Sequence, residues 1–84
     1  MGYTILFAEK AQKQLGKLSK LQASRIIDKI ESISEDPHRF VESCEGYPYY
    51  HLRIGNYRVI LELNDTIGTI EILKVGPRKK VYDR

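Results

Sequence analysis

A two-residue turn between two strand-like segments constrains the fold of this chain more than any other feature. Gly55 and Asn56 separate the segments Tyr49–Ile54 and Tyr57–Leu63, and each segment alternates apolar with polar residues. A turn of this composition between alternating segments is typical of an antiparallel β-hairpin. Because the loop has only two residues, it also fixes which residues face each other across the hairpin.

The predicted register sorts the hairpin into two faces. Arg53 is expected opposite Arg58, with the flanking pairs Ile54 and Tyr57, Leu52 and Val59, and His51 and Ile60. Successive side chains on a strand point to opposite faces of the sheet. One face is therefore apolar and is predicted to join the core: Tyr50, Leu52, Ile54, Tyr57, Val59 and Leu61. The other face carries Tyr49, His51, Arg53, Arg58 and Glu62.

The two arginines that face each other indicate a site for an anion. Like charges directly opposite on an antiparallel pair repel, so Arg53 and Arg58 lower the stability of the bare hairpin. A bound anion offsets that repulsion, because guanidinium groups bind phosphate and carboxylate strongly. The alternative is that both side chains extend into water or pair with Glu62.

The hydrophobic period changes twice before the hairpin. Residues 3–7 alternate like a short strand, whereas residues of about 8–18 and about 20–35 carry apolar side chains at helical spacing. Ser19 followed by Gln22 resembles a capping box at the start of the second helix. Asp36 and Pro37 are expected to end that helix, and residues 37–48 are predicted to be a loop that includes a solvated His38.

These elements predict one α+β domain over residues 1–84. The expected order is an N-terminal strand, a two-helix hairpin and a three-stranded antiparallel meander whose last strand is Thr69–Val75. The apolar stripe of the second helix has to be covered, so both helices are expected on one face of an antiparallel sheet. That stripe comprises Ala23, Ile26, Ile27, Ile30 and Ile33.

The positive charge of the chain lies in its second half. Of the 84 residues, 14 are Lys or Arg and 11 are Asp or Glu, and the whole excess falls within residues 46–84. Five of the six tyrosines lie there too. Arginine binds phosphate and tyrosine stacks on bases, so this composition suits a nucleic-acid site. The basic tail Arg78, Lys79, Lys80 with Tyr82 is expected to leave the sheet beside the Gly55-Asn56 turn; the alternative is a merely soluble terminus.

Several classes of function are disfavoured by what the sequence lacks. No His, Cys, Asp or Glu cluster has the spacing of metal ligands, and no glycine-rich phosphate loop is present. No serine or cysteine nucleophile has a convincing histidine partner. The single Cys44 fits a reducing cytoplasm, and no segment has the length or apolarity to span a membrane. We therefore expect a cytoplasmic protein without metal or other cofactor.

Two stretches of the chain resemble the RelE family of toxins from prokaryotic toxin–antitoxin systems. Residues 50–60, with the sequence YHLRIGNYRVI, are similar to the central hairpin of that family. Residues 75–82, with the sequence VGPRKKVY, are similar to its closing motif. The resemblance extends from Tyr3 to Tyr82. It implies a ribosome-dependent endoribonuclease that cuts messenger RNA in the ribosomal A site and thereby inhibits translation.

The resemblance also implies a set of site residues. Arg58 and Arg78 match arginines that stabilise the phosphate, and Tyr82 matches a terminal tyrosine implicated in proton transfer. His51 and Arg53 stand where the bacterial prototype has two lysines. Lys74, Lys79, Lys80 and Tyr49 are expected to contact the RNA. Pro77 departs from the family pattern, because many relatives have a histidine there.

Cleavage of RNA without a metal uses the 2′-hydroxyl as nucleophile on the adjacent phosphorus. It needs a base, an acid for the leaving 5′-oxygen, and cations for the charged phosphorane. Arg53, Arg58 and Arg78 supply cations. A phenol, with an ordinary pKa of about 10, is a poor base unless guanidinium groups lower that pKa. His51 is the other proton carrier, and the sequence leaves the division of roles between His51 and Tyr82 open.

A RelB-like antitoxin is the partner that the resemblance implies. The charge asymmetry predicts that this antitoxin is acidic and covers the basic second half and part of the helix hairpin. Two other functions stay open. One is a ParE-like toxin that inhibits DNA gyrase by binding, and the other is a non-catalytic RNA-binding toxin, which Pro77 favours.

Overall fold

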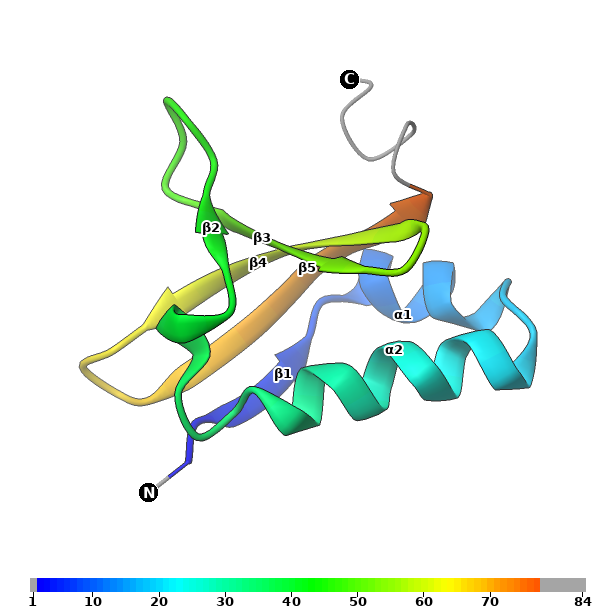
Figure 1. Cartoon of the computed structure of the whole chain (residues 1–84), viewed down its shortest axis with the longest axis horizontal. Coiled ribbons are helices and arrows are strands. Elements are labelled where there is room, and N and C mark those ends of the chain that lie inside the picture. Colours follow the sequence, from blue (N-terminus) through cyan, green and yellow to red (C-terminus); the bar gives the residue numbers. More distant parts are fainter. Residues whose placement is uncertain (1, 78–84) are drawn as a thin grey trace.

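A five-stranded sheet and a helix hairpin account for most of residues 2–77, which are the residues that this computed structural model describes (Figure 1). In chain order the elements are β1 (Thr4–Phe7), α1 (Glu9–Gly16), α2 (Lys20–Ser32), the short 3-10 helix η1 (Pro37–Arg39), β2 (Glu42–Ser43), β3 (Tyr50–Ile54), β4 (Tyr57–Asn64) and β5 (Thr69–Pro77). The strands lie side by side in the order β1-β5-β4-β3-β2. The fold class is α+β, as predicted.

The sheet is mixed, and the expectation of a purely antiparallel sheet is wrong. β1 pairs in parallel with β5, whereas the other neighbouring strands are antiparallel. The helix hairpin carries the chain from β1 at one edge across a face of the sheet to β2 at the other edge. The meander then runs back, and its last strand meets β1 in the same direction. Parallel strands cannot be joined by a tight hairpin, and here the helix hairpin and the meander together form the connection from β1 to β5.

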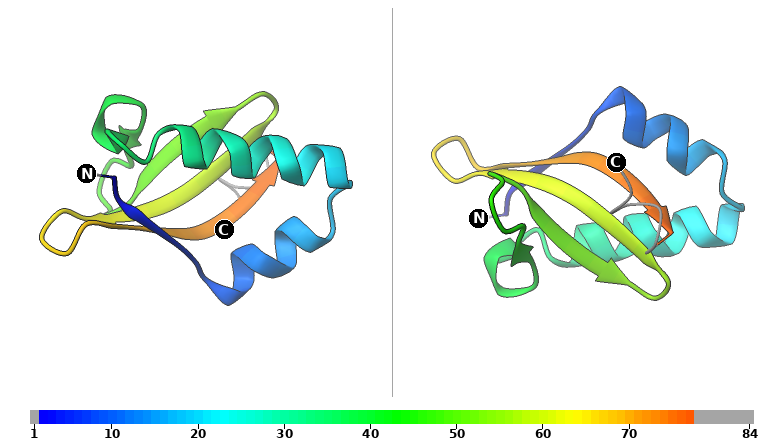
Figure 2. Two further views of the ribbon diagram at one scale, coloured as in Figure 1. Left: turned by 90° about the horizontal axis from the view of Figure 1, so that it is seen from below. Right: turned by 90° about the horizontal axis from the view of Figure 1, so that it is seen from above.

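Both helices lie on the same face of the sheet, as predicted (Figure 2). α1 ends at Gly16, and α2 begins after Ser19, whose hydroxyl accepts a hydrogen bond from the backbone N–H of Gln22 at 3.2 Å. α2 ends at Ser32 rather than near residue 35. The hydroxyls of Ser32 and Ser34 donate to carbonyl oxygens of the last turn, and such local bonds compete with continuation of a helix.

The core is the layer between the helix hairpin and the inner face of the sheet. The buried apolar residues are Ala11, Leu15, Ile26, Ile30, Ile33, Leu52, Val59, Leu61, Ile70, Ile72 and Val75. They include three members of the stripe predicted on the second helix and three of the six hairpin residues assigned to the core, while Tyr50, Ile54 and Tyr57 pack against them.

No helix within residues 2–77 has the length and apolar character needed to cross a membrane.

The segment predicted to be a loop contains two short elements. η1 and the two-residue strand β2 fall within residues 37–48, and β2 pairs with β3 through Glu42 opposite His51 and Ser43 opposite Tyr50. Two residues are too few to show a period of alternation, so no sequence pattern marks β2. On the other side of the meander, Ile60 pairs with Lys74 and Leu61 with Ile72, which makes Leu73 an extra residue on β5.

Candidate functional site

The register of the central hairpin is the one predicted. Arg53 lies opposite Arg58, and the flanking pairs are Ile54 with Tyr57, Leu52 with Val59 and His51 with Ile60. Gly55 adopts a φ of 58°, and no non-glycine residue within residues 2–77 has a positive φ. Glycine in the left-handed region at the first loop position is the requirement of a type II′ hairpin turn. The turn therefore sets Arg53 and Arg58 opposite each other on the sheet face away from the helices.

Two cross-strand rows on this outer face hold four of the predicted site residues, Arg53, Arg58, His51 and Lys74. One row runs from Arg53 through Arg58 to Gly76, which is the partner of Arg58 on β5. The neighbouring row contains Glu42, His51, Ile60 and Lys74, one residue from each of β2 to β5. Because Gly76 has no side chain, β5 contributes no bulk next to Arg58. Lys74 lies on the same face of the sheet as His51.

Arg58 is the buried cation of the site. It is only 5% exposed although it projects from the face without helices. Its Nη1 donates a hydrogen bond to Nδ1 of His51, with 3.3 Å between the two nitrogens. A buried guanidinium is stable only when hydrogen-bond acceptors replace its water. The imidazole of His51 is one such acceptor.

Glu42 contacts His51 from the other side of the ring. Its Oε1 lies 2.9 Å from Nε2 of His51, whose side chain is 16% exposed, while the Glu42 side chain is 80% exposed. The two residues are direct cross-strand partners, so the backbone register brings them together. Sequence analysis could not single out Glu42, because this contact depends on the unpredicted strand β2.

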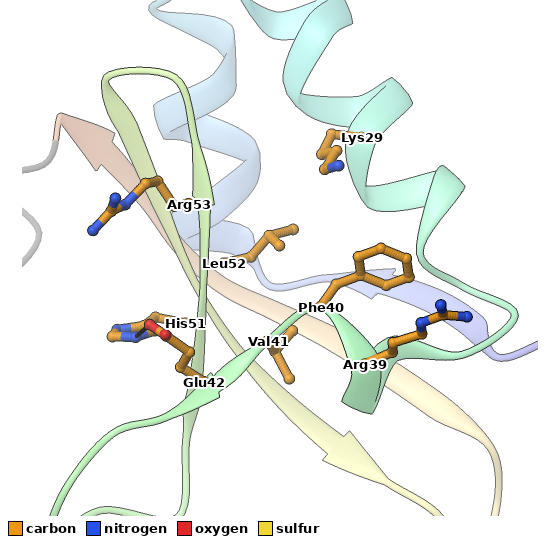
Figure 3. A pocket seen from close by; sticks show the side chains of 8 residues that line it. All are labelled: Lys29, Arg39, Phe40, Val41, Glu42, His51, Leu52 and Arg53. Atoms are coloured by element: carbon orange, nitrogen blue, oxygen red, sulfur yellow. Dashed lines mark hydrogen bonds and ion pairs between the residues drawn. The ribbon is translucent and has the colours of Figure 1, made fainter.

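A hollow of about 400 Å³ lies between α2, the η1–β2 segment and β3 (Figure 3). It is lined by Lys29, Arg39, Phe40, Val41, Glu42, His51, Leu52 and Arg53. Lys29, Arg39 and Arg53 give it a positive lining, and Nζ of Lys29 lies 5.5 Å from the centre of the Phe40 ring. In Figure 3, Leu52 lies on the helix side of β3, whereas His51 and Arg53 project to the opposite side. The cationic lining therefore extends from the outer face around the edge of the sheet formed by β2 and β3.

The remaining predicted site residues divide into one that is described and four that are not. Tyr49 immediately precedes β3, and its ring is stacked on Tyr47 with 6.3 Å between ring centres. Arg78, Lys79, Lys80 and Tyr82 lie outside the described residues. β5 ends at Pro77 opposite Tyr57, beside the Gly55-Asn56 turn, and the tail therefore starts where the sequence predicted.

The other titratable groups do not form a second site on this face. Burial raises the pKa of the Cys44 thiol, an effect that nearby Arg58 opposes, so the thiol stays protonated rather than becoming a nucleophile. His38 is exposed, as expected, and its Nε2 is hydrogen-bonded to Asp65 at 2.8 Å. Within residues 2–77, no group of three or more His, Cys, Asp and Glu side chains could hold a metal ion.

The chain is similar to toxins of toxin–antitoxin systems in sequence and in structure. The family model described as "ParE toxin of type II toxin-antitoxin system, parDE" matches residues 5–82. No curated protein sequence matches the chain significantly.

Three solved structures, all toxin–antitoxin complexes, illustrate the likeness. The RelBE2 complex of Mycobacterium tuberculosis matches with a TM-score of 0.83 and 26% identity over 93% of this chain and 100% of that chain. The archaeal RelE–RelB complex of Pyrococcus horikoshii matches with a TM-score of 0.77 and 30% identity over 93% and 97%. The RelB–RelE complex of Methanococcus jannaschii matches with a TM-score of 0.72 and 32% identity over 93% and 95%.

Proposed function

The chain belongs to the RelE/ParE superfamily of toxins of type II toxin–antitoxin systems, and on that basis we propose that it is a ribosome-dependent endoribonuclease that cuts messenger RNA. The observation that carries the proposal is the pair Arg53 and Arg58, set opposite each other on the sheet face away from the helices, with His51 hydrogen-bonded to Arg58. This arrangement supplies two fixed cations and a proton carrier at one place.

The chemistry that fits these groups is attack of a 2′-hydroxyl on the adjacent phosphorus. Guanidinium groups held by the sheet need no reorganisation when negative charge develops on the phosphorane. Arg78 and Tyr82 are proposed to complete the site from the tail that follows Pro77, and Lys74, Lys79, Lys80 and Tyr49 to hold the RNA. The ribosome is required because so small a site depends on its host to bend the message into line for attack.

Inhibition of DNA gyrase is the second candidate function. The match of residues 5–82 to the ParE toxin family favours it. A toxin that acts by binding alone has no need of a histidine hydrogen-bonded between a carboxylate and a buried guanidinium. The Glu42–His51–Arg58 network therefore favours cleavage over gyrase binding.

A RelB-like antitoxin is the proposed partner. The similar structures from Mycobacterium, Pyrococcus and Methanococcus are complexes of a toxin with such an antitoxin. An acidic antitoxin segment suits the outer face, because Arg53 and Lys74 project there and Lys29 and Arg39 line the adjoining hollow.

Expression of the chain without an antitoxin separates the two candidate functions. The proposed activity predicts growth arrest with new 5′ ends inside translated regions of messages, while plasmid supercoiling stays normal. Primer extension detects the first effect, and plasmid topology on a chloroquine gel detects the second. Growth arrest with intact messages and relaxed plasmids would replace the proposal by gyrase inhibition.

A further inference from the structure

We propose that Glu42 is a positioning residue that holds His51 as the general base of the cleavage reaction, with Nδ1 of the ring facing the phosphate site. The inference rests on the proposed function and assigns the step that the sequence leaves open. Three features carry it: the 2.9 Å contact from Glu42 to Nε2, the 3.3 Å contact from Arg58 to Nδ1, and the cross-strand register that builds the first contact into the sheet.

The two contacts fix the tautomer of His51. A guanidinium group can only donate hydrogen bonds, so Nδ1 of His51 is an acceptor and carries no proton. A neutral imidazole then carries its proton on Nε2, where the Glu42 carboxylate accepts it. The result is a carboxylate that orients an imidazole through one nitrogen and leaves the lone pair of the other directed at the site. The same division of labour operates in Asp–His pairs of hydrolases.

Phosphate binding is the event that exposes this base. The hydrogen bond from Arg58 to Nδ1 is long, at 3.3 Å, compared with about 2.9 Å for a typical N–H···O bond. A phosphate oxygen carries negative charge and is a stronger acceptor for guanidinium than a neutral imidazole is. When the scissile phosphate takes the Arg58 N–H, Nδ1 becomes available, while Glu42 keeps the ring in place.

Glu42 also offsets the charge that forms on His51. Once Nδ1 has accepted a proton, the imidazolium lies beside Arg58 and two residues from Arg53 along the same face of β3. Arg58 and Arg53 add further positive charge to this part of the face. The carboxylate at 2.9 Å counters them, as does the negative phosphorane.

In the proposed cleavage step one bond to phosphorus forms, one bond to phosphorus breaks, and two protons move. The 2′-hydroxyl gives its proton to Nδ1 of His51, and its oxygen forms a bond to phosphorus. The bond from phosphorus to the 5′-oxygen breaks, and this oxygen takes the phenolic proton of Tyr82. The products are a 2′,3′-cyclic phosphate and a 5′-hydroxyl. The imidazolium and the phenolate then exchange a proton through solvent, which restores both side chains.

A double-mutant cycle on programmed ribosomes tests the positioning role. We expect Glu42→Ala to lower the single-turnover cleavage rate by about 10- to 100-fold, the range typical when the partner that orients a metal-bound histidine is removed. Binding to the ribosome and the thermal midpoint should stay unchanged. In a His51→Ala background, Glu42→Ala should slow cleavage no further, because Glu42 acts only through His51. Glu42→Gln, which keeps the size of the side chain, replaces Glu42→Ala if that variant does not fold.

Glu45→Ala is the matched control, because Glu45 is an exposed acid three residues further along the same connection. It should cleave at the wild-type rate. An equal loss from Glu42→Ala in the wild-type and His51→Ala backgrounds would overturn the inference, as would a His51→Ala variant that cleaves normally. If the wild-type protein does not cleave at all, the proposed function fails instead.

The tautomer is measured independently of cleavage. Long-range ¹⁵N–¹H correlation spectra of the free protein should show His51 with the proton on Nε2 and an unprotonated Nδ1. A proton on Nδ1 of the neutral ring would contradict the inference even if the protein cuts RNA.

Discussion

Arg58 is 5% exposed, yet it projects from the sheet face that carries no helix. Its place opposite Arg53 was predictable from the sequence, because the Gly55-Asn56 turn fixes the register of the hairpin. Its hydrogen bond to His51 was not, because His51 lies opposite Ile60 and reaches Arg58 along the diagonal of the ladder. Side-chain direction within a face is a property of packing that periodicity does not encode.

His38, Asp65 and Tyr3 form a second polar cluster at the other end of the hairpin strands. Nε2 of His38 lies 2.8 Å from Oδ1 of Asp65, and the Tyr3 hydroxyl donates to the same oxygen at 2.8 Å. These bonds join η1, the β4–β5 turn and the residue before β1. The hydrogen bond from His38, and to a smaller extent the one from Tyr3, holds the pKa of Asp65 below its ordinary value. The same bond to Asp65 raises the pKa of the Tyr3 hydroxyl.

The cluster predicts an acid-sensitive contribution to stability. Because the pKa of Asp65 is lower in the folded protein, its contribution is complete well above the ordinary value of 3.8 and is lost as the pH falls through the folded pKa. Urea midpoints measured between about pH 6 and about pH 2.5 should therefore fall less steeply for Asp65→Asn than for the wild type. Asp28→Asn, the same change at an exposed position of α2, should keep the wild-type slope. Equal slopes for all three proteins would contradict a stabilising role of the Asp65 carboxylate.

The central hairpin carries both arginines of the site on adjacent strands. Its register requires Gly55 in the left-handed region, at a φ of 58°. Gly55→Ala should lower the free energy of unfolding by about 1–2 kcal/mol, because an L-residue is strained in that conformation. Equilibrium unfolding in urea measures the change.

Gly16→Ala is the control for that prediction. A Cβ atom built at either Gly16 or Gly55 meets no atom within 4 Å, so the two substitutions differ in backbone conformation and not in crowding. At the end of α1, alanine should leave stability unchanged or raise it by up to about 1 kcal/mol. A Gly55→Ala variant as stable as Gly16→Ala would contradict the strained turn.

Longer elements were predicted well and the shortest was not. Ile26, Ile30 and Ile33 repeat at helical spacing, and Leu52, Val59 and Leu61 follow the alternation of strands, so their burial could be predicted. β2 has two residues and shows neither period, and with it the sequence analysis missed Glu42. The parallel pairing of β1 was also missed, because strand order depends on how the whole chain returns across the sheet.

Charge is the property of the whole molecule that bears on its partner. The net charge of +3 belongs to the second half of the chain, and Arg53, Arg58 and Lys74 lie on one face of the sheet. The association rate constant with the proposed acidic antitoxin should therefore fall about tenfold or more as salt rises from low to high concentration. Stopped-flow fluorescence measures this rate. An association rate that salt does not change would argue against an acidic partner on this face.

Cleavage at the outer face is the central claim for the molecule as a whole. The rate of message cleavage on purified, programmed ribosomes tests it most directly, with the wild type compared with Arg58→Ala, Arg78→Ala and Tyr82→Phe. Loss of a cation that meets the phosphorane should lower the rate by about 10²–10³-fold, and Tyr82→Phe should weaken cleavage with the fold intact. Arg25→Ala, at an exposed position of α2, is the control and should cut like the wild type. Equal cleavage by the wild type and Arg58→Ala would contradict the account.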